Sequence, residues 1–239
     1  MIRVASIIFS YNDPVRVLRC YGELLRTRTE NHRIFVLDNS RPGLGAKTPD
    51  TIWLGEDNVG HGGMIDFVVG WADAEHYDFV GMLNCDTWGY RKDFMQRMLP
   101  YMDDTIGMIS PAIAQGSCWP CMSPAGKPRG ARFSNFVETI APYYNWRLLE
   151  AMQPLCPFEK YGYVDRALSV FSIRHGFRNR IVDATSIQHD AGAGMADDAR
   201  AELQAKWRAS LLAWCDGRQS IQDTPDLWPD EINAMELPR

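Results

Sequence analysis

The sequence predicts an α/β fold: one domain with a central, mostly parallel sheet flanked by helices. Apolar runs of strand length alternate with amphipathic segments of helix length, which is typical of parallel sheets with right-handed crossovers. Several of these runs end directly in polar or acidic residues. A chain of 239 residues suits one domain with a single sizeable core.

Four short apolar runs in the first half are expected to be strands. The first is rich in β-branched residues, as strands buried on both faces are. The runs are residues 4–9, 34–37, 52–54 and 79–83.

Two amphipathic segments lie between these runs. Asp13-Pro14 supplies an N-cap and a proline at the first helical position, so a helix is expected over residues 14–27. Its apolar positions at helical spacing are Val15, Leu18, Gly22 and Leu25. The second helix is opened by Asn58-Val-Gly60-His-Gly62-Gly63. Its expected inward face consists of Met64, Phe67, Val68 and Trp71.

Polar tripeptides follow three of the expected strands. They are Ser10-Tyr-Asn, Asp38-Asn-Ser and Asn84-Cys-Asp86. The carboxyl ends of parallel strands border the crevice in which open α/β sheets bind ligands. A carboxylate there, such as Asp86, can hold a divalent cation that neutralises a diphosphate leaving group. The combination indicates a nucleotide-sugar site, although a strand that ends in Asp is also typical of an ordinary turn.

In order and spacing, these segments resemble the family 2 glycosyltransferases of the GT-A, Rossmann-like fold. The matching runs are residues 7–12, 36–40, 58–63 and 83–86. The chain looks closest to the rhamnosyltransferase-like branch, in which Asn-x-Asp stands in for Asp-x-Asp. The resemblance covers residues 3–110 well and 155–190 more loosely, and it does not extend to residues 111–154 or to the tail after 217.

The resemblance implies a metal-dependent and inverting transfer of a sugar from a UDP- or TDP-sugar to an acceptor hydroxyl. It assigns nucleotide-sugar binding to Ser10, Tyr11, Asp38, Asn58, Gly60, Gly62, Gly63 and Asn84. It assigns Mn²⁺ or Mg²⁺ to Asp86 and His189, although a lone histidine at a strand end is often structural.

The same resemblance makes Asp165 the general base that deprotonates the acceptor. The usual Glu-Asp-x-Asp pattern is incomplete here, because Tyr163 and Val164 stand where further acids are expected. Glu159 is the nearest substitute. The alternative is that Asp165 is merely a first-turn acid that satisfies backbone N–H groups of its helix.

The expected organisation is a transferase domain over residues 1–216 and a C-terminal arm over 217–239. Within the domain, residues 1–110 form the nucleotide-sugar half and residues 111–216 the acceptor half. Residues 110–133, rich in proline and glycine, are expected to be a long irregular connection. A helix with Val164, Leu168 and Phe171 facing inward, a strand over 181–190 and a helix over 196–216 should follow.

The acceptor stays open between a saccharide or glycolipid and a hydroxymethylated pyrimidine of viral DNA. Five aromatic residues between 133 and 146 could belong to the core or stack against sugars or bases. They are Phe133, Phe136, Tyr143, Tyr144 and Trp146. A basic cluster of Lys127, Arg129 and Arg132 would suit DNA phosphates.

Composition and local motifs limit the other classes of protein to which the chain can belong. The net charge of −5 argues against general nucleic-acid binding, and no apolar stretch approaches bilayer length, so a cytoplasmic protein is expected. Peripheral membrane binding stays open. Cys118 and Cys121 have C-x-x-C spacing, yet a zinc site needs two more ligands.

Two other functions remain as alternatives. A nucleotidyltransferase would need a glycine-rich basic loop after the first strand, where this chain has acidic and glycine-free residues 10–13. A non-catalytic nucleotide-sugar-binding module would have lost its base.

Overall fold

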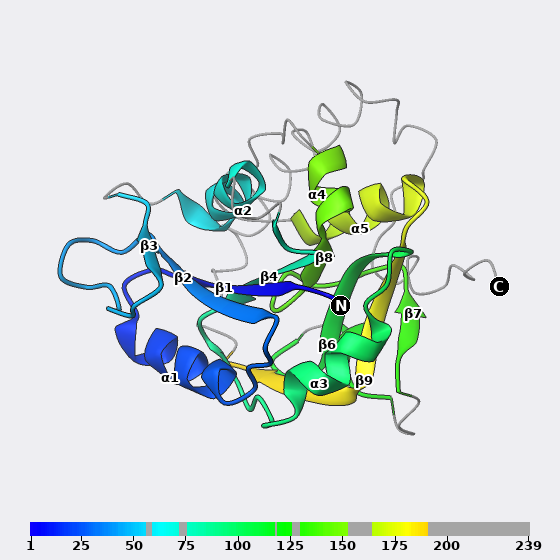
Figure 1. The fold of residues 1–239 in the computed structure, drawn as a ribbon, viewed down its shortest axis with the longest axis horizontal. Coiled ribbons are helices and arrows are strands. Elements are labelled where there is room, and N and C mark those ends of the chain that lie inside the picture. Colours follow the sequence, from blue (N-terminus) through cyan, green and yellow to red (C-terminus); the bar gives the residue numbers. More distant parts are fainter. Residues whose placement is uncertain (56–58, 72–75, 118, 126–129, 153–163, 191–239) are drawn as a thin grey trace, which may run out of the picture.

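The computed structural model describes residues 1–55, 59–71, 76–117, 119–125, 130–152 and 164–190. Within these residues the strands form one nine-stranded sheet, in the order β3-β2-β1-β4-β8-β6-β9-β5 with β7 beside β9 (Figure 1). The strands are β1 (Val4–Ser10), β2 (His32–Asp38), β3 (Thr51–Trp53), β4 (Phe79–Asn84), β5 (Thr87–Trp88), β6 (Ile106–Gln115), β7 (Arg132–Ser134), β8 (Tyr143–Asn145) and β9 (Arg178–His189).

Helices cover both faces of the sheet. In Figure 1, α1 and α3 lie below it, and α2, α4 and α5 lie above it. The helices are α1 (Pro14–Leu25), α2 (Gly60–Gly70), α3 (Phe94–Met98), α4 (Trp146–Ala151) and α5 (Val164–Arg174). Short 3₁₀ turns η2 (Leu99–Tyr101) and η3 (Pro120–Met122) complete the described elements. The predicted α/β class, a central sheet flanked by helices, is confirmed.

The first half of the sheet is parallel, as predicted. β1 pairs in parallel with β2 and β4, and β2 pairs in parallel with β3. Ser10 therefore lies beside Asp38, and Phe9 lies beside Asn84. The polar tripeptides that follow these strands thus meet at one edge of the sheet.

The second half of the sheet mixes directions. β8 runs antiparallel between β4 and β6, while β6 and β9 are parallel. β5 and β7 each pair antiparallel with β9. One continuous sheet therefore passes through both predicted halves of the domain, and β9 brings its carboxyl end back toward the turn after β4.

The prediction of a wholly irregular connection over residues 110–133 was wrong. β6 continues to Gln115, η3 follows, and β7 begins at Arg132. Pro111 lies inside β6, where the pairing with β9 shifts register between Pro111 and Ala112. A proline lacks a ladder N–H and is tolerated at such a bulge, so local composition underestimated the strand.

Helix α1 begins as predicted, with the Asp13 side chain accepting from the Arg16 amide at 3.1 Å. The predicted apolar positions, however, face outward: Val15 is 77% exposed, and Leu18 and Leu25 are also exposed. The side packed on the sheet consists of Val17, Cys20, Tyr21 and Leu24. Both stripes have helical spacing, so periodicity alone could not choose between them.

Most of the aromatic run belongs to the core. Phe136, Tyr143 and Tyr144 are buried. Tyr143 packs so tightly on Gly81 of β4 that a Cβ on Gly81 would lie 2.5 Å from its ring. Phe133 is exposed instead, with the guanidinium groups of Arg178 and Arg180 over its ring.

Several predicted features lie outside the described residues. They are the 196–216 helix, the 217–239 arm, Asn58, Glu159, Tyr163, Lys127, Arg129 and Cys118. Among the described residues, no helix is long and apolar enough to cross a bilayer.

Candidate active site

Asp38 is the centre of a polar cluster where β1 and β2 end. Its Oδ1 accepts from the Ser10 hydroxyl at 2.9 Å, from the Ser40 amide at 3.1 Å and from the Ser40 hydroxyl at 2.6 Å. Gly45 covers the same carboxylate, since a Cβ there would lie 1.8 Å from Oδ2. Asp38 is therefore where the sequence predicts it, but it is only 5% exposed and already binds neighbouring groups.

Two asparagines that the sequence analysis did not single out shape the same edge. Asn12 has a left-handed backbone (φ 53°), and its amide donates to the Ser40 hydroxyl at 2.7 Å. Asn39 Oδ1 accepts from the Val59 amide at 2.7 Å, which ties the end of β2 to the start of α2. Both residues belong to the polar tripeptides that follow the strands, and this position was the sequence signal that could have identified them. Tyr11, directly before Asn12 in the chain, is exposed.

Glycines let α2 begin close to its neighbours. Gly60 is buried with a left-handed backbone (φ 65°), and Gly62 is buried as well. A Cβ on Gly63 would lie 2.7 Å from the Val59 side chain. Local geometry thus favours glycine at positions 60 and 63, whatever these residues contact in a complex.

His61 fills the space between this helix and β1. Its ring packs edge-on against Phe9, with centroids 5.3 Å apart. Within the described residues, its buried Nε2 has no hydrogen-bond partner. Burial lowers the pKa of His61 to about 4, and the nearby charge of Asp86 only partly opposes this. The imidazole is therefore neutral at physiological pH.

Asp86 and His189 come together although they are far apart in the sequence. Asp86 lies in the turn between β4 and β5, and the pairing of β5 with β9 puts Thr87 opposite His189. Oδ1 of Asp86 is 3.2 Å from Nε2 of His189. On the other side of the ring, Nδ1 donates to the Gly116 carbonyl at 3.0 Å. Asn84, predicted as a sugar-binding residue, ends β4 just before this turn and is partly exposed.

The charge state of His189 reflects these contacts. Burial by itself lowers the pKa of His189, but the Asp86 carboxylate and the Gly116 carbonyl outweigh it, and the net pKa is raised. In the neutral tautomer that donates from Nδ1, a lone pair on Nε2 would face the carboxylate. That contact is repulsive unless a proton or a cation lies between the two groups.

The pair fits a divalent cation. The Oδ1 atom of Asp86 is buried and, within the described residues, has no hydrogen-bond partner unless His189 is protonated. Donation of the second ring N–H to a backbone carbonyl is the usual arrangement of a metal-bound histidine. No group of three or more acidic, histidine or cysteine side chains in the described chain could hold a metal. A cation here would therefore need further oxygen ligands from a diphosphate and from water, as Mg²⁺ and Mn²⁺ commonly take.

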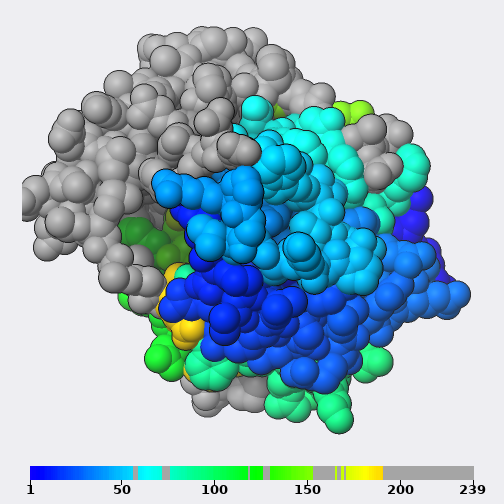
Figure 2. Space-filling model, turned by 90° about the vertical axis from the view of Figure 1, so that its left-hand side faces the viewer, coloured from blue at the N-terminus to red at the C-terminus, as the bar shows by residue number. Residues whose placement is uncertain are grey.

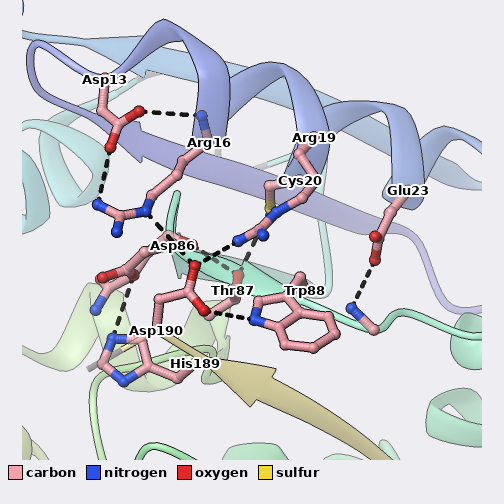
Figure 3. Close-up of polar contacts among 12 residues, drawn as sticks. Asp13, Arg16, Arg19, Cys20, Glu23, Asp86, Thr87, Trp88, His189 and Asp190 are labelled. Carbon is pink, nitrogen blue, oxygen red and sulfur yellow. Dashed lines mark hydrogen bonds and ion pairs between the residues drawn. The ribbon is translucent and has the colours of Figure 1, made fainter. Parts of the chain in front are cut away.

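Asp190, directly after β9, binds side chains of α1 and so fixes the end of β9 against this helix (Figure 3). Its carboxylate accepts from Arg19 and from the Trp88 indole, each at 2.8 Å, and Arg16 lies 3.6 Å away. Its amide donates to the Asp86 carbonyl at 2.9 Å. Figure 2 shows the yellow end of β9 lying against the dark blue N-terminal residues. The contacts of Asp190 hold the Asp86 turn and His189 together, and they were not predicted from the sequence.

Asp165 occupies the first turn of α5, as predicted, and is partly buried. Its charge acts on a second acid, Glu138, on the loop between β7 and β8. The Glu138 Oε2 accepts from the Ser117 hydroxyl at 2.5 Å. Burial, followed by the charge of Asp165, raises the pKa of Glu138 to about 7, although the Ser117 bond and His189 oppose the rise. Glu138, one of two glutamates within residues 111–154, stands in no recognisable motif and gave no sequence signal.

Of the predicted basic cluster, the structure describes Arg132, whose side chain makes contacts within the protein. Arg132 pairs with Asp183 and donates to the carbonyls of Cys121 and Ser123 at 2.6 and 2.7 Å. Its guanidinium thus braces the 121–123 turn against β9. On β9, Arg180 binds the Tyr101 carbonyl at 2.7 Å.

Comparison with solved structures agrees with this architecture. A mannosyltransferase from Pyrobaculum calidifontis, in complex with GDP-Man and Mn²⁺, matches with a TM-score of 0.66 and 13% identity, over 98% of this chain and 68% of the other. TarS 1–349 of S. aureus in complex with UDP-GlcNAc matches with a TM-score of 0.62 and 12% identity, over 97% and 70%. TarS 1–349 without that ligand gives 0.58 and 9%, over 93% and 77%.

The chain has the GT-A glycosyltransferase fold. No family model matches the sequence, and no curated protein matches it either. At identities of 9–13% the structural likeness concerns the fold alone. The predicted glycosyltransferase fold is confirmed, while the rhamnosyltransferase-like branch stays a prediction.

Proposed function

We propose that the protein is a nucleotide-sugar-dependent glycosyltransferase that uses a divalent cation and inverts the anomeric configuration. The observation that carries the proposal is the Asp86–His189 pair, in which a buried carboxylate oxygen lies 3.2 Å from an imidazole nitrogen. The pair lies at the carboxyl edge of the sheet, where α/β folds bind ligands. The mannosyltransferase with this fold was solved with GDP-Man and Mn²⁺, and TarS with UDP-GlcNAc.

The donor would lie along this edge, with the nucleoside over the ends of β1 and β2. Ser10, Tyr11 and Asp38 would form the nucleoside side. Asn58 and the start of α2 at Gly60, Gly62 and Gly63 would border the ribose and diphosphate, with Asn84 on the sugar side. Because the Asp38 carboxylate is nearly buried, its role would be largely to hold Ser10 and Ser40 in place.

Asp86 and His189 would hold Mn²⁺ or Mg²⁺ against the diphosphate. The bound cation would supply a Lewis acid that stabilises the charge of the leaving group. Asp165 would accept the acceptor proton as the hydroxyl oxygen bonds to the anomeric carbon. The bond from that carbon to the diphosphate oxygen would break, and its electron pair would leave with the nucleotide. One displacement of this kind inverts configuration.

Donor binding and donor turnover test the proposal together. Calorimetry with UDP-, TDP- and GDP-sugars, each with and without Mn²⁺, should give binding for one nucleotide that weakens when the metal is removed. The preferred donor should also be slowly hydrolysed, with release of the nucleoside diphosphate. Binding without hydrolysis or transfer would favour the non-catalytic module, and no binding of any nucleotide sugar would reject the proposal.

A further inference from the structure

Two adjacent residues after β6 connect the proposed metal pair to a partly buried acid, Glu138. The Gly116 carbonyl accepts from His189, and the neighbouring Ser117 hydroxyl donates to Glu138 at 2.5 Å. The Trp119 amide donates to the same hydroxyl at 3.0 Å, which fixes its orientation. Glu138 is therefore held at a defined position relative to His189.

The loop that carries Glu138 is also held against α5. Ser169 accepts from the Val137 amide at 3.0 Å. Asp165 stands four residues before Ser169, and residues at this spacing share one face of a helix. Glu138 directly follows Val137, which brings its backbone next to this face of α5. The charge of Asp165 raises the pKa of Glu138, which agrees with this placement.

The contacts of Glu138 within the described residues give no structural reason for an acid at this position. Within the described residues, Ser117 is the one hydrogen-bond partner of its carboxyl group, and no cation pairs with it. A partly buried carboxyl without an ion-pair partner costs stability. Its pKa of about 7 leaves it able to donate as well as accept near neutral pH. Such groups cluster at functional sites.

We propose that Glu138 and Asp165 form a two-carboxyl subsite for a saccharide acceptor with neighbouring hydroxyl groups. Asp165 receives the hydroxyl that attacks, and Glu138 binds the hydroxyl next to it. This inference rests on the proposed function and specifies its acceptor. Two acids in one subsite repel a phosphate-bearing acceptor, and the guanidinium of Arg132, once expected to meet DNA phosphates, is engaged by Asp183.

The test uses the full chain with its donor and Mn²⁺. The acceptor probes are methyl glycosides of mannose, glucose, galactose and rhamnose, with an oligonucleotide that contains hydroxymethylcytosine as the other class. Glu138→Gln should raise KM for the preferred glycoside by roughly 10- to 100-fold, as expected for a lost hydrogen bond to a charged group, and change kcat much less. Glu138→Asp should recover part of the affinity. Glu150→Gln, on the exposed side of α4, is the matched control.

A deoxy probe separates acceptor binding from a structural role. The monodeoxy analogue that lacks the hydroxyl next to the attacking one should bind the wild-type protein weakly. It should lose nothing further in Glu138→Gln, because both changes remove the same contact. The inference would be overturned if the deoxy analogue weakened binding equally in wild type and in Glu138→Gln. It would also be overturned by an unchanged KM in Glu138→Gln, or by turnover of the oligonucleotide and of no glycoside.

Nucleotide binding distinguishes the two possible failures. If wild-type protein binds no nucleotide sugar, the proposed function fails. If it binds and hydrolyses the donor and Glu138→Gln matches the wild type toward every glycoside, the acceptor subsite alone fails. Circular dichroism and melting curves on each variant confirm that it is folded.

Discussion

The Gly116 carbonyl accepts a hydrogen bond from Nδ1 of His189, and this contact aims the opposite ring nitrogen at Asp86. Gly116 has a positive φ of 88°, and a Cβ there would lie 1.9 Å from the His189 carbonyl oxygen. Only glycine fits so close to the end of β9. A hydrogen bond from the side chain at the end of β9 to a backbone carbonyl just after β6 thus orients the histidine that faces the Asp86 carboxylate.

Asp86→Ala should abolish transfer without unfolding the protein, because the residue lies in a turn outside the core. The rate should fall by roughly 10²-fold or more, since a bound cation supplies several kcal/mol of charge stabilisation. EDTA should have the same effect on the wild type, with recovery by Mn²⁺ or Mg²⁺. Asp66→Ala, an exposed acid on α2, is the control. Full activity after metal removal would reject the metal assignment of both Asp86 and His189.

Asp165→Asn should fold and bind the donor normally, yet lose about 10²–10⁴-fold in transfer rate if Asp165 is the general base. If Asp165 is only a first-turn helix acid, the variant should lose a few tenths to about 1 kcal/mol of stability and keep its turnover. Melting temperature and transfer rate measured on one sample decide between these outcomes. Near-wild-type turnover would direct attention to Glu159 and Glu138.

Asp38→Ala should weaken nucleotide binding and also destabilise the fold. The carboxylate accepts from the Ser10 hydroxyl and from two groups of Ser40, and these donors would lose their partner. Unfolding free energy should fall by roughly 1–3 kcal/mol. Chemical denaturation and calorimetry with the preferred nucleotide measure the two effects. Unchanged stability would contradict the hydrogen-bonded cluster, and unchanged affinity would place the nucleoside pocket elsewhere.

The buried His32 should make the fold sensitive to mild acid. Its Nε2 and the Tyr143 hydroxyl each lie 2.8 Å from the Ser6 hydroxyl, in the core. Burial, aided by Arg28, lowers the pKa of His32 to about 4. The unfolded chain takes up a proton below pH 6.5 or so, while the folded chain resists until about pH 4. Stability from this group is therefore present above pH 6.5 and decreases as the pH falls toward 4.

Denaturation curves at several pH values measure this effect. His32→Gln cannot titrate, so its stability should fall less over the same interval, with His61 supplying part of the remaining slope. The exposed His76 provides a control in His76→Gln. Identical pH slopes in His32→Gln and wild type would contradict the neutral, buried state of His32.

Much of the donor side could be predicted because it depends on local patterns. The strands β1, β2 and β4 are short apolar runs, and the polar residues after them meet at one edge once the strands are parallel. The start of α1 was likewise marked by its N-cap and proline. The sequence did not mark which side of α1 faces the sheet. Val15 and Val17 belong to two equally periodic stripes, and only contact with the sheet distinguishes the buried stripe from the exposed one.

By itself, the sequence determined the α/β class, the parallel donor half and the positions of Asp38, Asp86 and Asp165, because these follow from strand length, helix caps and polar strand ends. The resemblance anticipated that Asp86 and His189 act together, and the tertiary structure supplied the β5–β9 pairing that joins them. Only the tertiary structure decided that Asp190 binds side chains of α1 and that the loop carrying Glu138 is held against α5. These contacts join segments far apart in the chain. Their formation depends on strand pairing and helix packing across the whole sheet, which no local spacing records.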